Sequence, residues 1–123
     1  MATLSAIIEK PLPAGVGEDS FNMLSAYLGT DNGMQIRDYI IHHSLAGFFS
    51  IRKGKWKLTT NLGSGGFTQP VNDDPKEGDK AGTLYNLQDD INEQNNLYNE
   101  YPDVVEKLTQ LLQNSKEFTS SLK

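Results

Sequence analysis

The spacing of apolar residues near the end of the chain predicts an amphipathic helix. Pro102 suits the first turn of a helix, because the N–H that proline lacks would find no partner there. Beyond it, apolar residues recur about every 3.6 positions and form a single stripe. The stripe consists of Val104, Val105, Leu108, Leu111 and Leu112. We therefore expect a helix that begins at Pro102 and covers an apolar surface.

The middle of the chain has the pattern of antiparallel strands. RDYIIHHS (37–44) and GFFSIRKG (47–54) are rich in β-branched and aromatic residues, and KWKLTT (55–60) alternates strictly. TLYNL (83–87) resumes as a further short strand. A Lys53–Gly54 hairpin turn would place Ile51 opposite Trp56 and Phe49 opposite Leu58, giving one apolar face. The other face would then be basic, with Arg52, Lys55 and Lys57.

Two short helices are predicted before the strands. Residues 2–9 have a helical apolar spacing, and a proline-rich stretch ends that segment. Residues 21–28 form a second candidate, with Asp19 or Ser20 as the N-cap and Gly29 as the end. Helices this short are not stable alone, so their apolar faces need a partner surface.

The remaining segments predict loops. Residues 61–82 contain Gly, Pro, Asn and Asp too densely for regular structure, and residues 88–97 indicate turns in which Asp and Asn side chains bond the local backbone. The fold class we expect is α+β: a small antiparallel sheet of about four strands packed against a C-terminal helix, preceded by short N-terminal helices.

Composition narrows the range of functions. The 123 residues suit one modest core, and a net charge of −5 with a pI near 4.9 argues against nucleic acid as a partner. No apolar run approaches the length of a membrane span, and the start of the chain lacks the basic and apolar regions of a signal peptide. Because cysteine is absent, disulfides, thiolate metal sites and a cysteine nucleophile are excluded within these residues.

His42 and His43 are the first candidates for chemistry. Neighbouring side chains on a strand point to opposite faces, so the two rings cannot hold one metal ion on a regular strand. Two interpretations stay open. One histidine is a strand-end residue bonded to the backbone, or it contacts a substrate.

The other motifs carry weaker signals. The basic cluster Arg52, Lys53, Lys55 and Lys57 is either a solvated outer face or a surface that faces an anion. GSGG at 63–66 lacks the lysine and the following helix of a phosphate-binding loop. The acidic residues at 73–74 and 89–93 miss the spacing of a calcium-binding EF-hand and favour solvated turns. The residues themselves show no metal site and no catalytic constellation.

Three stretches resemble the C-terminal portion of the arylsulfatase-type sulfatases: FFSIRKGKWKLTTNLGSGGF, LYNLQDDINEQNNL and YPDVVEKLTQLLQ. In that family an aromatic-x-Ile/Val-Arg-x-Gly-x-Trp/Tyr-Lys strand pair precedes Leu-Tyr-Asn/Asp-Leu-x-x-Asp-x-x-Glu-x-x-Asn-Leu and a closing helix. Here Asp90, Glu93, Asn96 and Leu97 keep the family's spacing. The N-terminal residues resemble the last helices of the family's catalytic domain.

The resemblance implies a division of the chain and of the chemistry. Residues 1–30 would be the end of the catalytic domain and a link, and residues 31–123 the C-terminal subdomain. Family members hydrolyse sulfate esters with calcium and a formylglycine made in a Cys/Ser-x-Pro-x-Arg motif, which this sequence lacks. The chain alone would therefore be inactive and would need the sulfatase catalytic domain as its partner. The resemblance also implies a periplasmic or secreted parent protein.

By the same resemblance, the chain would help to shape the pocket for a sulfated small molecule or glycan. The substrate-binding candidates are His42, His43, Ser44 and, in the GSGGF loop, Ser64. Two alternatives remain. One is a stand-alone module that binds sulfated or acidic glycans with its basic hairpin face, through Lys55 and Lys57. The other is an independent small hydrolase that uses His42 or His43.

Overall fold

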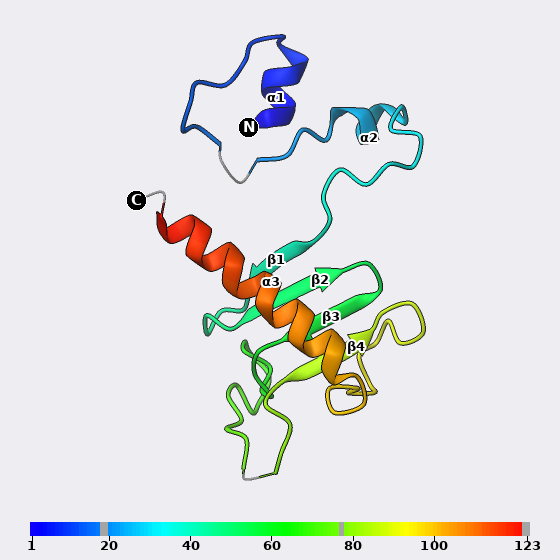
Figure 1. Cartoon of the computed structure of the whole chain (residues 1–123), viewed down its shortest axis with the longest axis vertical. Coiled ribbons are helices and arrows are strands. Elements are labelled where there is room, and N and C mark those ends of the chain that lie inside the picture. Colours follow the sequence, from blue (N-terminus) through cyan, green and yellow to red (C-terminus); the bar gives the residue numbers. More distant parts are fainter. Residues whose placement is uncertain (18–19, 77, 122–123) are drawn as a thin grey trace. The chain divides into compact units, whose positions relative to one another are not determined.

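A computed structural model describes residues 1–17, 20–76 and 78–121 of the chain (Figure 1). The chain divides into two compact units, Met1–Asp38 and Tyr39–Lys123.

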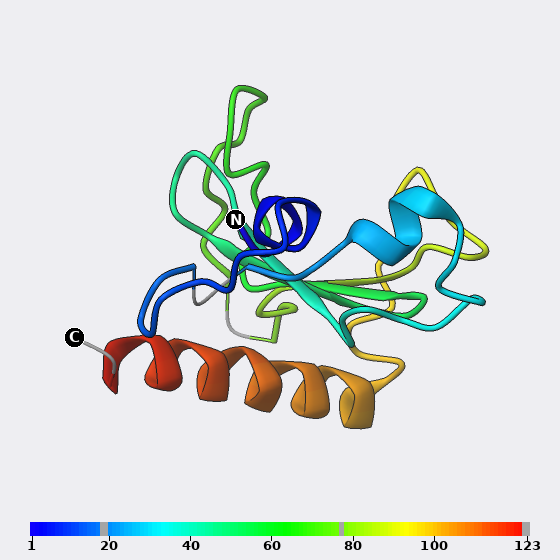
Figure 2. The same cartoon turned by 90° about the horizontal axis from the view of Figure 1, so that it is seen from above.

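The larger unit is a four-stranded antiparallel sheet with a helix on one face. Strands β1 (Ile40–His43), β2 (Phe49–Lys53), β3 (Trp56–Thr59) and β4 (Thr83–Asn86) lie in sequence order, each paired with the next. Helix α3 (Pro102–Ser121) crosses the strands along one face (Figures 1 and 2). The predicted α+β class and the helix start at Pro102 are confirmed.

The core of this unit joins alternate strand residues to the apolar stripe of α3. Its buried members are Ile51, Leu58 and Leu84 from the sheet and Val105, Leu108 and Leu112 from the helix. The other two residues of the predicted stripe, Val104 and Leu111, pack against this cluster. Because burying a large aliphatic side chain stabilises a fold by roughly 1.5–3 kcal/mol, this stripe is the main reason that α3 stays on the sheet.

The hairpin register differs from the prediction by a one-residue shift of the turn. Ile51 lies opposite Leu58, and Lys53 lies opposite Trp56, so the turn residues are Gly54 and Lys55. Gly54 has φ +56°, and glycine at the first of two turn positions suits the twist of a hairpin. The predicted Lys53–Gly54 turn, with Ile51 opposite Trp56, was wrong. Each side chain stays on the face predicted for it, because the shift moves every cross-strand partner by two residues and side chains alternate between faces with a period of two.

The segment after β4 folds back through side-chain to backbone bonds, as predicted. The Asp90 carboxylate accepts the backbone N–H groups of Gln94 (3.0 Å) and Asn95 (2.8 Å), which lowers the pKa of this carboxyl group. The Leu97 side chain then packs against the core. In the long loop before β4, the described part of residues 61–82 contains no helix or strand, in agreement with the sequence.

The smaller unit contains α1 (Ala2–Ile7) and α2 (Leu24–Leu28). Both helices are shorter than predicted, and neither has a buried residue. The N-cap of α2 is Met23, so Ser20 is not the cap; its hydroxyl instead accepts the backbone N–H of Ala2 at 2.6 Å. The other cap candidate, Asp19, lies outside the described residues. Gly29 ends α2 with φ +66°, as expected.

Candidate substrate-facing loops

Two loops meet at one end of the sheet. The β1–β2 turn (44–48) and the first half of the β3–β4 loop (61–71) both leave the sheet there, because β1 and β3 run in the same direction. A hydrogen bond from the backbone N–H of Ala46 to the carbonyl of Gly65 joins them at 2.9 Å. We call residues 43–48 and 61–71 the loop end.

Gly65 makes this contact possible. The residue is buried and has φ +62°, and a Cβ atom at this position would overlap the side chain of Ser44. Only glycine combines the left-handed backbone with so close an approach. The GSGG stretch therefore allows the two loops to pack closely against each other.

Hydrogen bonds within the 61–71 loop also stabilise it. Ser64 and Gly65 donate their backbone N–H groups to the carbonyls of Pro70 (2.9 Å) and Val71 (2.8 Å). Asn61, which is 8% exposed, donates its amide to the carbonyl of Gly63 at 2.9 Å. These bonds define the shape of the loop although it contains no strand in its described residues.

Three of the four candidate residues lie at the loop end. His43 Nδ1 lies 2.9 Å from the carbonyl oxygen of Ser44, which can only accept, so Nδ1 is the donor of this hydrogen bond. The hydroxyl of Ser44 accepts the backbone N–H of Phe48 at 3.1 Å, and that of Ser64 donates to the carbonyl of Thr68 at 2.5 Å. In this arrangement both serine hydroxyls stabilise turns.

His42 points to the other face of the sheet. It pairs with Ser50, whereas His43 pairs with Phe49 and lies edge-on to its ring at 6.0 Å. The two imidazoles therefore lie on opposite faces, as the strand pattern predicts. Both histidines are exposed.

The loop end also exposes two large apolar side chains. Phe67 of the GSGGF loop is 94% exposed, and Leu45 of the β1–β2 turn is 75% exposed. The sequence singled out the GSGGF loop but not Leu45, because one leucine between Ser44 and Ala46 carries no signal of its own. Together they give the loop end an apolar character.

The residues present do not fit the cofactors of a sulfatase centre. Among the described residues, no three His, Asp or Glu side chains gather where a metal ion could bind. The chain has no cysteine and no Ser-x-Pro-x-Arg from which formylglycine could form. Within the described part of the chain, no helix is both long and apolar enough to cross a membrane.

Comparisons with known proteins place this fold. No family model matches the sequence. An N-acetylgalactosamine-6-O-sulfatase from Bacteroides thetaiotaomicron is 31% identical over 94% of this chain, which spans 22% of that protein. A solved structure described under the metabolism of multiple glycosaminoglycans by the same bacterium is 29% identical, with a TM-score of 0.74 over 94% of this chain and 24% of that one.

A second solved structure supports the fold alone. The protein Ps i-CgsB is 16% identical, with a TM-score of 0.60 over 92% of this chain and 22% of that one. The chain thus spans about a fifth to a quarter of the length of the proteins it matches. Sequence identity over nearly the whole chain and the shared fold match this chain to the C-terminal portion of a sulfatase.

Proposed function

We propose that this chain is the C-terminal subdomain of a sulfatase that hydrolyses sulfate esters, and that its loop end shapes the substrate pocket without supplying the reactive groups. Residues 1–30 form the end of the catalytic domain in this proposal, and residues 31–123 form the subdomain. In this proposal, the residues that bind calcium and the residue that becomes formylglycine belong to the parent protein and lie outside this chain. The name of the 31% identical relative supports a sulfated N-acetylgalactosamine residue as the substrate.

The observation that carries the proposal is the joining of the β1–β2 turn to the β3–β4 loop through Gly65. The contact between Ala46 and Gly65 fixes two loops that are far apart in sequence and presents His43 and Phe67 at the same end of the sheet. An imidazole ring offers a hydrogen bond to a sugar hydroxyl, and an exposed phenyl ring offers a stacking surface. Neither group needs to take part in bond cleavage.

The exposed helices of the N-terminal unit support the same proposal. The large apolar side chains Leu4, Ile7 and Leu28 are each more than half exposed. Apolar groups at this density favour burial against a further protein surface. The catalytic domain of the parent sulfatase is the partner we propose.

A chimera tests the proposal. The matching C-terminal segment of the Bacteroides relative is replaced by this chain, and hydrolysis of N-acetylgalactosamine 6-sulfate is measured for the chimera and for the 123-residue chain. We expect turnover by the chimera and none by the chain alone. His43→Ala, Ser44→Ala and Ser64→Ala in the chimera should raise KM with little change in kcat, since groups that bind ground state and transition state alike affect KM.

The control is Arg52→Ala, which alters an exposed residue near the other end of β2 and should leave both constants unchanged. His42→Ala separates the two faces of β1, because a loss confined to the His43 variant would restrict the site to one face. Turnover by the isolated chain that disappears in a histidine variant would overturn the proposal in favour of an independent hydrolase.

The alternative function, a stand-alone module that binds glycans with the basic hairpin face, has less support. Its two proposed contacts are Lys55 and Lys57. Lys57 Nζ lies 2.6 Å from Glu93 Oε1, so its charge is offset. Lys55 lies in the turn, with Nζ 5.2 Å from the centre of the Trp56 ring. If Lys55→Glu combined with Lys57→Glu abolished glycan binding by the isolated chain, that face would be the binding surface after all.

A further inference from the structure

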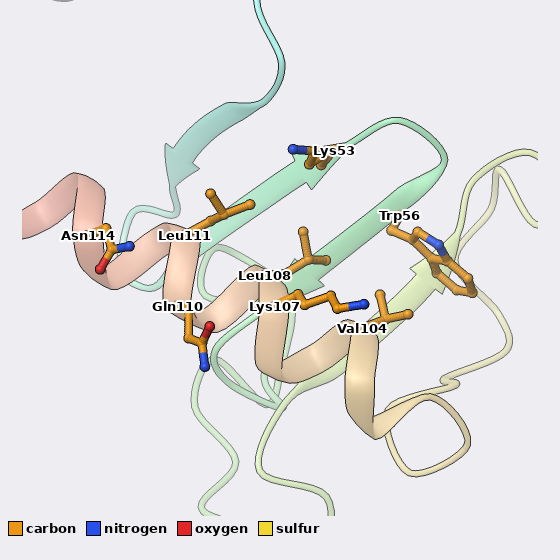
Figure 3. A pocket seen from close by; sticks show the side chains of 8 residues that line it. All are labelled: Lys53, Trp56, Val104, Lys107, Leu108, Gln110, Leu111 and Asn114. Atoms are coloured by element: carbon orange, nitrogen blue, oxygen red, sulfur yellow. The ribbon is translucent and has the colours of Figure 1, made fainter.

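Helix α3 meets β2 at both ends of this strand. Part of the helix borders a pocket of about 550 Å³, together with Lys53 and Trp56 on either side of the hairpin turn (Figure 3). At the other end, Lys116 of the helix contacts Phe49. Lys53 is the last residue of β2, whereas Phe49 is the first and borders the loop end. The helix therefore has a direct contact beside the candidate substrate-facing loops.

The ring of Phe49 contacts two other side chains. The ammonium group of Lys116 lies over the ring, with Nζ 3.8 Å from its centre. The imidazole of His43 makes a T-shaped contact, with the ring centres 6.0 Å apart and an angle of 62° between the planes. Side chains from β1, β2 and α3 therefore form one cluster beside the loop end.

Both contacts favour particular orientations of the rings. A phenyl ring carries partial negative charge on its faces and partial positive charge at its edge, so a T-shaped pair has a preferred angle. A cation is attracted to the face, so Lys116 favours the observed plane of the Phe49 ring. Phe49 also packs against the core, which limits its rotation. The phenyl ring is therefore a fixed surface for the imidazole of His43.

A hydrogen bond holds this part of α3 close to the sheet. The hydroxyl oxygens of Tyr39 and Ser115 lie 3.0 Å apart, and the Ser115 hydroxyl donates to the carbonyl of Leu111 at 2.8 Å. Because a hydroxyl has one proton, Tyr39 is the donor in the first bond. Tyr39 packs against the core, and Lys116 follows Ser115 on the helix. The position of Lys116 over Phe49 is therefore supported by a neighbouring contact.

His43 is exposed but is held at two points. Its Nδ1 donates to the carbonyl of Ser44 at 2.9 Å, and its ring contacts Phe49. An exposed side chain without such contacts samples several rotamers, and fixing one of them on binding costs conformational entropy. With Nδ1 engaged, Nε2 is the ring nitrogen that can meet a ligand, and its position depends on the orientation of the ring. The contact with Phe49 therefore helps to decide where Nε2 lies.

We propose that Phe49 is a positioning residue, which fixes the imidazole of His43 for its contact with the substrate, and that Lys116 of α3 stabilises Phe49 in this role. The contact with substrate rests on the function proposed above, whereas the positioning of His43 is a property of this chain alone. Phe49 acts through His43 and does not itself contact the substrate. Its loss should therefore weaken substrate binding and leave bond cleavage unchanged.

Nuclear magnetic resonance of the 123-residue chain tests the positioning without turnover. The sequence contains two histidines, so their imidazole signals are assigned with His42→Ala and His43→Ala. We expect nuclear Overhauser effects between the ring protons of His43 and Phe49. In Phe49→Leu the His43 signals should move toward those of a free histidine, because an aromatic ring shifts the signals of nearby protons. The signals of His42, on the opposite face, should stay in place.

Matched variants separate positioning from a general loss of structure. Phe49→Tyr keeps the aromatic ring and should keep the His43 signals. Lys116→Met removes the charge but keeps an unbranched side chain, and it should move the His43 signals less than Phe49→Leu does. Lys107→Met is the control, since Lys107 is also an exposed lysine of α3 but lines the pocket near the hairpin turn (Figure 3). Near-ultraviolet circular dichroism checks that each variant is folded.

The chimera described above tests the consequence for the substrate. Phe49→Leu should raise KM about threefold with little change in kcat, and Phe49→Tyr should preserve both constants. When Phe49→Leu is added to His43→Ala, KM should rise no further than in His43→Ala alone. A residue that acts only through His43 has no effect once the imidazole is gone.

Three results would overturn the inference. The first is the absence of a nuclear Overhauser effect between the two rings. The second is unchanged His43 signals in folded Phe49→Leu or, should that variant not fold, in Lys116→Met. The third is a further rise in KM when Phe49→Leu is added to His43→Ala.

The two kinds of measurement also distinguish this inference from the proposed function. An inactive chimera, together with the expected changes in the His43 signals, would refute the proposed function alone. An active chimera, together with His43 signals that do not respond to Phe49→Leu, would refute only the positioning of His43.

Discussion

The side chain of Asn96 covers the outer edge of β4 by accepting the backbone N–H of Leu84 at 3.1 Å. The next residue, Leu97, donates its own N–H to the carbonyl of Leu84 at 2.8 Å. Both main-chain groups of an edge-strand residue are therefore satisfied by the segment that leads into α3. Open strand edges pair readily with other chains, so this contact protects the sheet as well as closing it.

Asn96→Ala should destabilise the larger unit. The change removes the bond to Leu84, a bond from Tyr98 N–H and a bond to the carbonyl of Gly82. We expect the free energy of unfolding to fall by roughly 1–3 kcal/mol, measured by urea denaturation. Asn95→Ala is the control, because Asn95 is exposed and its backbone N–H makes its contact with Asp90. Equal losses in the two variants would contradict the role given to Asn96.

Gly65→Ala should separate the two loops of the loop end. The new methyl group would meet Ser44 and the residue would keep a left-handed backbone, which costs a non-glycine residue roughly 1–2 kcal/mol. Gly54→Ala is the matched control, since Gly54 also has a positive φ but has no neighbouring atom where its Cβ would stand. The overlap should make Gly65→Ala about 1 kcal/mol more destabilising.

Backbone amide chemical shifts show whether the loss of stability in Gly65→Ala comes from separation of the two loops. Those of Ala46 and Phe48 should move in Gly65→Ala and stay in place in Gly54→Ala. The same loss of stability in both variants, with unchanged shifts at the β1–β2 turn, would show that the loops do not depend on this contact.

Asp90→Asn should change how stability depends on pH. The hydrogen bonds from the N–H groups of Asn95 and Gln94 lower the pKa of Asp90 in the folded chain. The stabilisation is therefore present above the unfolded pKa of about 3.9 and is lost as pH falls through the lower, folded value. The Asn variant should be less stable than the unmodified chain at neutral pH, and the difference should shrink below about pH 4.

Urea denaturation between neutral and acid pH measures this difference. Asp73→Asn is a suitable control, because Asp73 is an exposed residue of the long loop. A difference between Asp90→Asn and the unmodified chain that stays constant down to strongly acid pH would contradict the assignment.

The ion pair between Lys57 and Glu93 should contribute modestly to the stability of the larger unit. Its side chains are 21% and 34% exposed, and pairs near the surface contribute roughly 0.2–1 kcal/mol. A double-mutant cycle with Lys57→Met and Glu93→Gln should give a coupling energy in this range that decreases with added salt. A coupling near zero at low salt would show that the contact is incidental.

The sequence by itself determined the types of element and the face each one buries. Periodicity is a local property, so the stripe from Val104 to Leu112 and the alternation through Leu58 were sufficient to predict the helix, the strands and the α+β class. The turn after β4 was also predictable, because the bonds of Asp90 join residues close in sequence. The family resemblance rested on the same local strings and agrees with the comparisons.

The tertiary structure alone decided the register of the hairpin, because both registers bury the same face and differ only in the turn. It also decided that Ser44 meets Gly65, and that Lys53 and Lys107 line one pocket. Each of these pairs joins residues distant in the chain, and their approach depends on how the long loop and α3 pack on the sheet. Local patterns specify which surfaces are apolar, whereas packing determines which side chains meet.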